Sequence, residues 1–287
     1  MSTLDDELRT ALALARECGR IALAYQTGGS AAMQTRDKPD DAGPVTQADT
    51  EINARLVGAL RAAFPGDAVV GEESAADAEA ASGAARCWYV DPIDGTTEYA
   101  RGEACWAIQI GLCIDGEPVL GVVHEAAAGI LTWGVRHRDR AEACVVRGDT
   151  PPAPLRPSAR GLDALRLVSS KSHASPKTLE VMEVLRIAPE RNLRIGSVGV
   201  KINTIARGDA ELYVHPRAGT KLWDTCAPYA VLRAAGGAMT DLLGRPLEYD
   251  PRRLGHEAGL VASHGPHHPE ILAALRPRAL AWSIGQA

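Results

Sequence analysis

Aromatic residues are scarce in this sequence. They make up 4% of the 287 residues, and Phe occurs once. Because proteins that bind single-stranded nucleic acid stack bases on aromatic side chains, this scarcity argues against such a protein. The sequence also lacks a run of Lys or Arg, and its net charge of -5 is mildly acidic. We therefore expect no nucleic-acid polymer as a partner.

Long hydrophobic runs are also missing. The longest apolar stretches, such as Ala104–Ile114, are too short to span a bilayer and are interrupted by polar residues. The first residues, MSTLDDELRT, are acidic and lead into a helical pattern, without the basic and apolar regions of a signal peptide. The sequence thus predicts a cytoplasmic protein with no membrane partner.

Paired cysteines are absent too. None of the six cysteines belongs to a CxxC pair, and most have apolar neighbours. They are Cys18, Cys87, Cys105, Cys113, Cys144 and Cys226. This distribution favours free, buried thiols over disulfides or a zinc site. The chain is long enough for one large domain or two joined ones, and a soluble enzyme of small molecules is the default interpretation.

The first half contains two helical patterns followed by strand patterns. Apolar residues recur at intervals of three and four from Leu4 to about Tyr25, and again from Ile52 to Ala63, which predicts two amphipathic helices. Five short apolar runs then predict strands. They are DAVVG, CWYVD, CWAIQIGLCI, PVLGVVHE and GILTWGV.

The second half follows a proline-rich loop, GDTPPAPLRP, which marks a loop or hinge. Strand patterns LRLVSS, NLRIGS, ELYVH and MTDLLG alternate with helical patterns at about 176–185, near 201 and at about 225–235. We expect an N-terminal half at 1–150, a C-terminal half at 151–277 and a tail at 278–287. The alternation indicates an α/β (α+β) fold with helices packed on sheets.

The stretch WYVDPIDGTTEY places two carboxylates directly after an apolar run. Asp91 ends the predicted strand, where ligands commonly bind. Pro92 fixes the backbone and gives the Ile93 carbonyl a defined direction, and Asp94 directs a second carboxylate to the same space. Thr96 adds a hydroxyl. The pattern is equally typical of an acidic turn that caps a helix.

Two other segments add carboxylates. VVGEES places Glu72 and Glu73 after another strand pattern, and WDTCAP places Asp224 at the start of an apolar helix. A helix N-cap is the alternative role of Asp224. Together the three segments offer enough oxygen ligands for two or more Mg²⁺ ions, whereas no His or Cys set stands at zinc-ligand spacing.

A carboxylate-bound Mg²⁺ pair is suited to the hydrolysis of phosphate esters. Such chemistry also needs a base or a group that orients water, and PVTQAD supplies Asp49 in the loop before the second helix. Asp49 could instead be the N-cap of that helix.

Two rival site types conflict with the same stretch. Aspartate-nucleophile phosphatases of the haloacid dehalogenase type would need a nucleophile where Pro92 stands. An EF-hand calcium loop would need Glu where Arg101 stands.

GEES, DPIDGTTEY and WDTCAP, in this order, resemble the three motifs of the inositol monophosphatase superfamily. Within it, the resemblance is closest to the 3′(2′),5′-bisphosphate nucleotidases of the CysQ type and runs from about Leu8 to Pro251. It implies a layered α/β/α/β/α sandwich of the inositol monophosphatase / fructose-1,6-bisphosphatase type. It also implies two or three Mg²⁺ ions and sensitivity to lithium.

The resemblance assigns roles to single residues. The implied metal ligands are Glu72, Asp91, Asp94, Asp224 and the Ile93 carbonyl. Asp49 and Thr96 match the pair that activates the attacking water, and His173 and Lys201 lie in stretches, SSKSH and GSVGVK, that resemble nucleotide-binding segments. The helix start in GSVGVK has free N–H groups that suit a phosphate. The expected substrate-binding set is Gly95, Thr96, Ser172, His173, Gly199, Lys201, Arg217 and Asp224.

Three residues bear on the choice of substrate. Glu98 follows the nucleotidase pattern, and Arg217 stands where inositol enzymes have Glu. Arg cannot accept a hydrogen bond from an inositol hydroxyl but can pair with a second phosphate. Thr97, in contrast, is the inositol-type residue.

The resemblance therefore implies a Mg²⁺-dependent phosphatase that converts adenosine 3′,5′-bisphosphate to AMP, with 3′-phosphoadenylyl sulfate as a second candidate substrate and a role in sulfur metabolism. The alternatives are an inositol monophosphatase, a sugar bisphosphate phosphatase, or a metal- or nucleotide-binding regulatory protein without activity. We expect a monomer or homodimer.

Overall fold

The computed structural model describes residues 3–38, 43–171 and 175–282. Ser172 and His173, two of the expected substrate-binding residues, lie outside the described residues.

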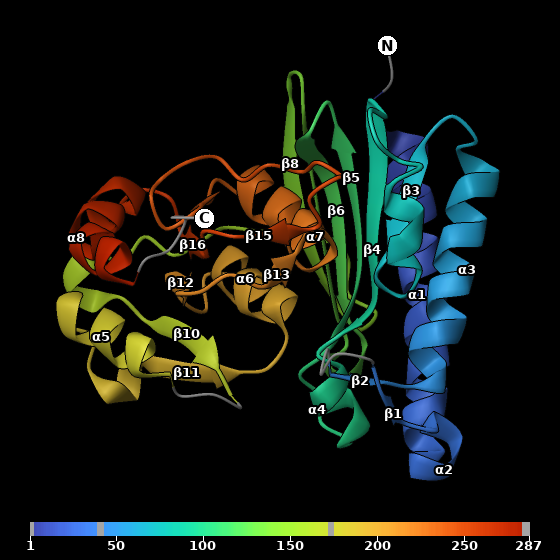
Figure 1. Ribbon diagram of the computed structural model, residues 1–287, viewed down its shortest axis with the longest axis horizontal. Coiled ribbons are helices and arrows are strands. Elements are labelled where there is room, and N and C mark those ends of the chain that lie inside the picture. The colour runs from blue at the N-terminus through green and yellow to red at the C-terminus, as the bar shows by residue number, and fades with distance from the viewer. Residues whose placement is uncertain (1–2, 39–42, 172–174, 283–287) are drawn as a thin grey trace.

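A seven-stranded sheet forms the first half of the structure (Figure 1). The strands follow one another across the sheet in chain order, with β3 and β4 parallel and the later neighbours antiparallel. They are β3 (Ala68–Gly71), β4 (Arg86–Asp94), β5 (Ala107–Ile114), β6 (Glu117–Glu125), β7 (Ile130–His137), β8 (Arg140–Arg147) and β9 (Ala153–Pro154). The five strands expected in the first half are confirmed.

Two helices cover one face of this sheet, α1 (Asp5–Thr27) and α3 (Gln47–Ala63) (Figure 1). Both are amphipathic as expected, and their apolar stripes join the largest core cluster. The start of α3 is fixed by a capping box in which Thr46 and Asp49 bond each other's backbone N–H groups. Asp49 therefore lies in the first turn of α3 rather than in the preceding loop.

The opposite face of the sheet is covered by α6 (Val198–Ala206) and α7 (Leu222–Ala234). Gly111, Gly121 and Gly134 stand side by side on β5, β6 and β7 under α7. A Cβ at Gly121 would lie 2.0 Å from the carbonyl oxygen of Ala227, and one at Gly134 would lie 2.7 Å from Cα of Val231. This row of glycines lets the backbone of α7 lie directly on the sheet.

A second, five-stranded sheet lies beyond α6 and α7, in the order β11-β10-β12-β16-β14. Its outer side carries α5 (Pro176–Val184) and α8 (His268–Ala281) (Figure 1). The strands are β10 (Leu167–Ser170), β11 (Asn192–Ile195), β12 (Leu212–His215), β14 (Ala238–Thr240) and β16 (Leu260–Ser263). The helices and sheets thus alternate as α/β/α/β/α, which confirms the expected fold.

Short elements complete the described chain. They are α2 (Gly29–Met33), β1 (Arg36–Asp37), β2 (Pro44–Val45), α4 (Thr96–Ala100), β13 (Thr220–Lys221) and β15 (Gly255–His256). Short 3-10 turns lie at Glu72–Ala78, Ala126–Ala128, Leu162–Ala164 and Pro189–Arg191.

Several elements go beyond the sequence-based expectation. β8, β16 and α8 were not predicted, and α8 continues through Pro277 to Ala281. Ala279, a residue of α8, is fully buried in the core. The expected tail from residue 278 therefore begins inside a packed helix.

The cysteines are free as expected, and all but Cys105 are buried. Across the described ranges, no helix is both long enough and apolar enough to cross a membrane.

Candidate active site

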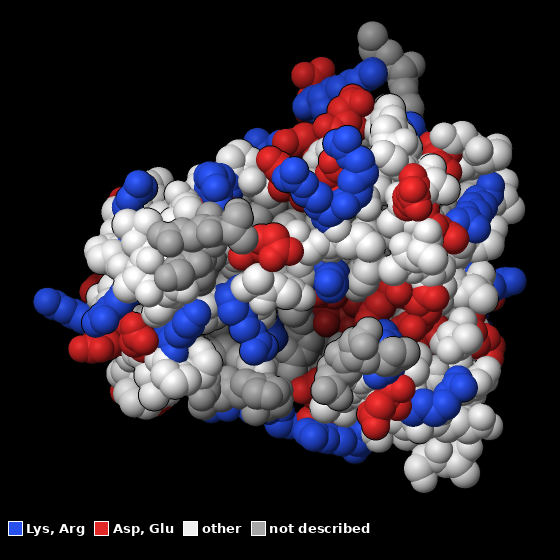
Figure 2. Space-filling model, viewed as in Figure 1, with Lys and Arg blue, Asp and Glu red and all other residues white. Residues whose placement is uncertain are grey.

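Five acidic residues from four segments of the chain lie near one another. Asp91 and Asp94 end β4, Glu72 follows β3, and Asp49 and Asp224 lie in the first turns of α3 and α7. Their charges influence one another's pKa values, which places the carboxylates close together. In the space-filling view, acidic side chains gather in the hollow at the centre of the molecule (Figure 2).

Asp91 is the most strongly perturbed of these acids. It is 1% exposed, and burial raises its pKa well above the usual value. The negative charges of Glu72, Asp94 and Asp224 raise that pKa further. A buried group of like charges is stable in its ionised form only when a cation neutralises it.

The donor set suits a hard divalent cation. Carboxylate oxygens are the ligands that Mg²⁺ prefers. In the described chain, no three acidic, His or Cys side chains are already arranged as a complete metal site. The acids that would hold the ion are therefore gathered, but they must adjust to bind it.

Lys38 is one reason why the described acids are not already arranged as a complete metal site. Its ammonium lies 2.6 Å from a carboxylate oxygen of Glu72 and 2.6 Å from one of Glu73. These ion pairs direct the two glutamates toward the segment before α3 and partly neutralise the acidic group. Sequence reasoning missed Lys38, although a lone Lys in the acidic loop TRDKPDDAG was a visible signal.

Asp94 is held by hydrogen bonds from two distant elements. Its carboxylate accepts bonds from Gln109 Nε2 at 2.7 Å, Ser197 Oγ at 2.5 Å, and the N–H groups of Val198 at 3.1 Å and Gly199 at 2.5 Å. Ser197 is the N-cap of α6, so Asp94 binds the positive end of that helix. Its carboxylate consequently has one fixed orientation.

The start of α6 differs from the expectation of a free phosphate-binding helix end. The N–H groups of Val198 and Gly199 are engaged by Asp94, and that of Val200 by Ser197 Oγ. A Cβ on Gly199 would lie 2.7 Å from the amide of Gln109. Gly199 therefore holds the Asp94 arrangement together and does not offer a free N–H to a substrate.

Lys201 lies in the second turn of α6 and is 4% exposed. Its ammonium donates to the Gly196 carbonyl and lies 5.2 Å from the ring centre of Tyr213. Burial lowers the pKa of Lys201 to about 8, while the charges of Asp94 and Glu98 act to raise it. This cation thus lies beside the acidic group and lines the adjoining pocket.

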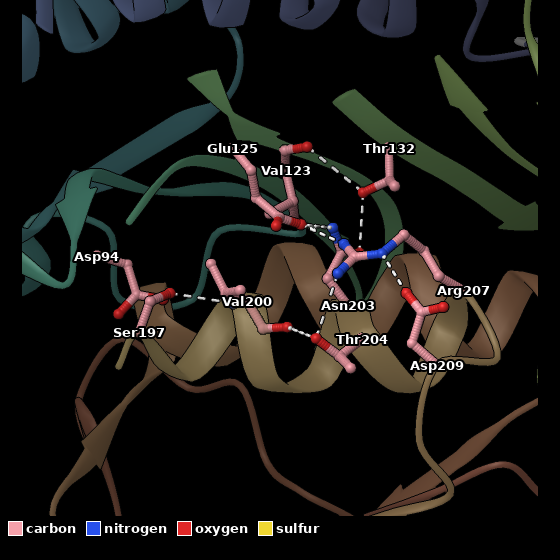
Figure 3. Close-up of polar contacts among 10 residues, drawn as sticks. All are labelled: Asp94, Val123, Glu125, Thr132, Ser197, Val200, Asn203, Thr204, Arg207 and Asp209. Carbon is pink, nitrogen blue, oxygen red and sulfur yellow. Dashed lines mark hydrogen bonds and ion pairs between the residues drawn. The ribbon is translucent and has the colours of Figure 1, made fainter. Parts of the chain in front are cut away.

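The other end of α6 is fastened to the seven-stranded sheet (Figure 3). Glu125 of β6 accepts from Asn203 Nδ2 at 3.0 Å and forms an ion pair with Arg207, and both charged side chains are buried. Thr132 Oγ1 donates to Asn203 Oδ1 at 2.8 Å. The helix that orients Asp94 is therefore fixed at both ends.

We expect Glu125→Ala to lower the free energy of unfolding by about 3–5 kcal/mol, because it removes the buried partner of Arg207 and leaves the guanidinium only the exposed carboxylate of Asp209. Asp209→Ala is the matched control, since Asp209 pairs with the same guanidinium but is 57% exposed. Its loss should cost less than about 1 kcal/mol. Urea unfolding of both variants measures the difference, and equal costs would contradict the role of this network.

Thr96 and Asp49 lie together beside the acidic group. The Thr96 hydroxyl is 3.0 Å from the Ile93 carbonyl oxygen and 3.3 Å from Asp49 Oδ1. Asp49 Oδ2 accepts from the N–H of Thr46 at 2.8 Å and from its hydroxyl at 2.5 Å. Burial raises the pKa of Asp49 to about 6. The Thr46 bonds hold one oxygen of Asp49 and leave the other directed at Thr96.

A pocket of about 700 Å³ adjoins Asp94. Several expected residues line it, namely Gly95, Thr97, Glu98, Lys201 and Arg217. Gly95 adopts φ 97°, and a Cβ there would lie 2.9 Å from the Cys105 carbonyl oxygen. Sequence reasoning missed the residues on the walls of the pocket beyond Lys201. They include Lys177, Glu180, Tyr213, His215 and Trp282.

Comparison with known proteins gives consistent results. The family model described as the inositol monophosphatase family matches residues 4–279. The 3′(2′),5′-bisphosphate nucleotidase CysQ of Escherichia coli strain K12 is 33% identical over 240 residues, which cover 83% of this chain and 92% of that protein. A 3′(2′),5′-bisphosphate nucleotidase 1 of Dictyostelium discoideum is 26% identical over 292 residues, covering 90% of this chain and 92% of the relative.

Solved structures show the same fold. The IMPase of Thermotoga maritima superimposes with a TM-score of 0.76 at 22% identity, over 96% of this chain and 99% of the other. An inositol monophosphatase of Zymomonas mobilis gives a TM-score of 0.73 at 25% identity, over 96% of this chain and 100% of the other. With the family match spanning almost its whole length, the chain belongs to the inositol monophosphatase family and is a phosphatase.

Proposed function

We propose that this protein is a Mg²⁺-dependent phosphatase that removes the 3′-phosphate of adenosine 3′,5′-bisphosphate, giving AMP and phosphate. 3′-Phosphoadenylyl sulfate is a second candidate substrate. The observation that carries the proposal is the pocket of about 700 Å³ beside Asp94, which is lined by the cations Lys201 and Arg217. It can take a ligand larger than the phosphate at the acidic group, and its cations suit a second anionic group. The names of the curated relatives support the same substrate class.

Glu72, Asp91, Asp94, Asp224 and the Ile93 carbonyl are the proposed metal ligands. When bound, Mg²⁺ supplies Lewis-acid polarisation of the phosphoryl oxygens and offsets charge on the leaving oxygen. The chain's own part is to hold these ligands in place, which the α6 N-terminus does for Asp94. Lys38 engages one carboxylate oxygen of Glu72, Oε1, and its ammonium offsets part of the negative charge there.

The proposed water-orienting pair is Thr96 and Asp49. A Thr96 hydroxyl that donates to Asp49 Oδ1 can accept a hydrogen bond from the attacking water. Asp49 then receives the proton through that bond. Its Oδ2 stays engaged by Thr46 throughout, which keeps Oδ1 directed at Thr96.

A substrate panel tests the proposal. With Mg²⁺ present, we expect adenosine 3′,5′-bisphosphate to be hydrolysed with a higher kcat/KM than inositol 1-phosphate or fructose 1,6-bisphosphate, measured as phosphate release. EDTA should abolish the activity. Faster turnover of inositol 1-phosphate would replace the proposal by an inositol monophosphatase. Hydrolysis of none of the three would favour a regulatory protein that only binds nucleotide or metal.

A further inference from the structure

We propose that the end of the pocket formed by Trp282, Lys177 and His215 is the binding site for the nucleobase of the substrate, and that Trp282 determines selectivity for nucleotides over base-free phosphate esters. This inference deepens the proposed function and rests on it. It assigns a function to the C-terminal end of the described chain, which sequence reasoning left without a role.

Trp282 lies just past the residues that the family model matches. The family match ends at residue 279, and Trp282 follows the last residue of α8. It is partly buried and packs on the core beneath α5 and α8 while also lining the pocket. The continuation of α8 beyond Pro277 is what carries this indole to the pocket wall.

The indole is positioned by two side-chain contacts. Its Nε1 donates to Glu180 Oε2 at 3.2 Å, and the Lys177 ammonium lies 5.5 Å from the ring centre. The same Glu180 oxygen, Oε2, forms an ion pair with Arg278 Nη1 at 3.6 Å. A preorganised aromatic wall binds a planar base at little cost in side-chain entropy, since its rotamer is already fixed.

Lys177 brings a cation to the same wall. Its ammonium donates to the Pro216 carbonyl oxygen at 3.2 Å. An ammonium has three N–H donors, so this bond leaves capacity for acceptor atoms of a ligand. The ring nitrogens of a purine are such acceptors, whereas an aliphatic alcohol offers no planar ring to the indole beside it.

His215 adds an imidazole to the lining of the same pocket. Its Nδ1 lies 3.1 Å from the Tyr213 hydroxyl, while its Nε2 is buried with no hydrogen-bond partner in the described structure. Burial, with the charges of Arg217 and Lys201, lowers the pKa of His215 to about 3, so the ring is neutral near pH 7. A neutral imidazole lets a planar base approach without bringing a further positive charge to this part of the pocket.

The pocket therefore has two chemically different parts. Asp94, Gly95 and Lys201 line it beside the acidic group, whereas Trp282 and Lys177, 5.5 Å apart, form its aromatic end. A nucleotide has a matching division into phosphate and base. Inositol phosphates and sugar phosphates have no group that matches the aromatic end.

Binding of AMP and of ribose 5-phosphate, measured by calorimetry on the full chain with Mg²⁺, separates the base from the rest of the ligand. We expect Trp282→Leu to weaken AMP binding by about 5- to 100-fold, as loss of one stacked base does, and to leave ribose 5-phosphate binding unchanged. Trp282→Phe should retain most of the AMP affinity. Leu280→Ala, a change on the same helix at a side chain that is 51% exposed, is the matched control and should bind both ligands as the wild type does.

Unchanged AMP affinity in Trp282→Leu, or an equal loss for both ligands, overturns the base site. The thermal midpoint of each variant confirms folding. Because the binding measurement does not depend on turnover, a failure of the base site can be distinguished from a failure of the proposed function. If the wild type discriminates AMP from ribose 5-phosphate through Trp282 but does not hydrolyse adenosine 3′,5′-bisphosphate, the base site stands and the proposed reaction falls.

Discussion

Asp91→Asn is expected to abolish turnover and, in the absence of metal, to stabilise the fold. Burial, and then the negative charges of Glu72, Asp94 and Asp224, hold the pKa of Asp91 well above its usual value. In metal-free protein at pH 7 its ionised form is therefore destabilising, and a neutral amide of the same shape removes the repulsion. The Oδ1 bond from the Ile93 N–H, 3.0 Å long, can be kept by the amide oxygen.

The substitution should raise the stability of the metal-free protein and lower the turnover of the metal-bound protein. We expect the free energy of unfolding in EDTA to rise by at least about 1 kcal/mol, the value of roughly one pKa unit. With Mg²⁺, kcat should fall by more than about 100-fold, a loss that even outer partners of a metal can cause. Urea unfolding in EDTA and phosphate release in Mg²⁺ measure the two effects. A less stable Asp91→Asn protein in EDTA would contradict the proposed electrostatic conflict.

The pH dependence has a defined sign. Because the folded pKa of Asp91 lies above its unfolded pKa, folding favours the protonated acid. Its contribution to stability is fully present below the unfolded pKa and is lost as the pH rises through the folded pKa. In EDTA, the stability of Asp91→Asn should decline less over that range than that of the wild type.

Asp94→Asn is the informative comparison. It also removes a metal ligand, so turnover should fall as strongly. Asp94, however, accepts four hydrogen bonds, and an amide NH₂ cannot accept those made to the oxygen that it replaces. We therefore expect Asp94→Asn to destabilise the metal-free protein by about 1–3 kcal/mol, the cost of buried groups left unpaired.

The sequence indicates which acidic residues stand at strand ends and helix starts, because each is marked by a local pattern. Asp91 and Glu72 follow apolar strands, and Asp49 and Asp224 begin apolar helices. Strand ends and helix starts are readable from short-range periodicity and turn residues. The proposed metal ligands could thus be named before the fold was known.

The contacts that organise those acids were not predictable in the same way. Asp94 is bonded by Ser197, Val198 and Gly199, more than 100 positions later in the chain. The N–H groups of an isolated helix start look free, and only the packing of α6 on the first sheet shows that a carboxylate already engages them. Gln109, the one polar side chain within the apolar run AIQIGLCI, was the local hint of such a partner.

The C-terminal helix shows a different limit. Pro277 lacks an N–H and normally ends or bends a helix, and the expected tail begins directly after it. In the structure, α8 continues because Ala279 and Trp282 pack into the third core cluster. Tertiary burial here outweighs a local signal, and this contribution cannot be read from the local sequence.

Thr96→Val is the second change for which we expect a large effect. Valine keeps the shape of threonine but has no hydroxyl, so it cannot pass a proton from water to Asp49. Positioned proton transfer contributes about 100- to 10,000-fold to a rate, and kcat should fall within that range. Because the hydroxyl bonds the Ile93 carbonyl as well, a small loss of stability is expected alongside.

Two further variants separate chemistry from structure. Thr96→Ser keeps the hydroxyl and should retain most of kcat, and Asp49→Asn should lose kcat about as strongly as Thr96→Val. If the two residues act as one unit, the double variant Asp49→Asn with Thr96→Val should be no slower than either single one. Additive losses in steady-state kcat would show that Asp49 and Thr96 act independently. Since Thr46 holds Asp49 through Oδ2 alone, unit behaviour is the outcome that the hydrogen bonds favour.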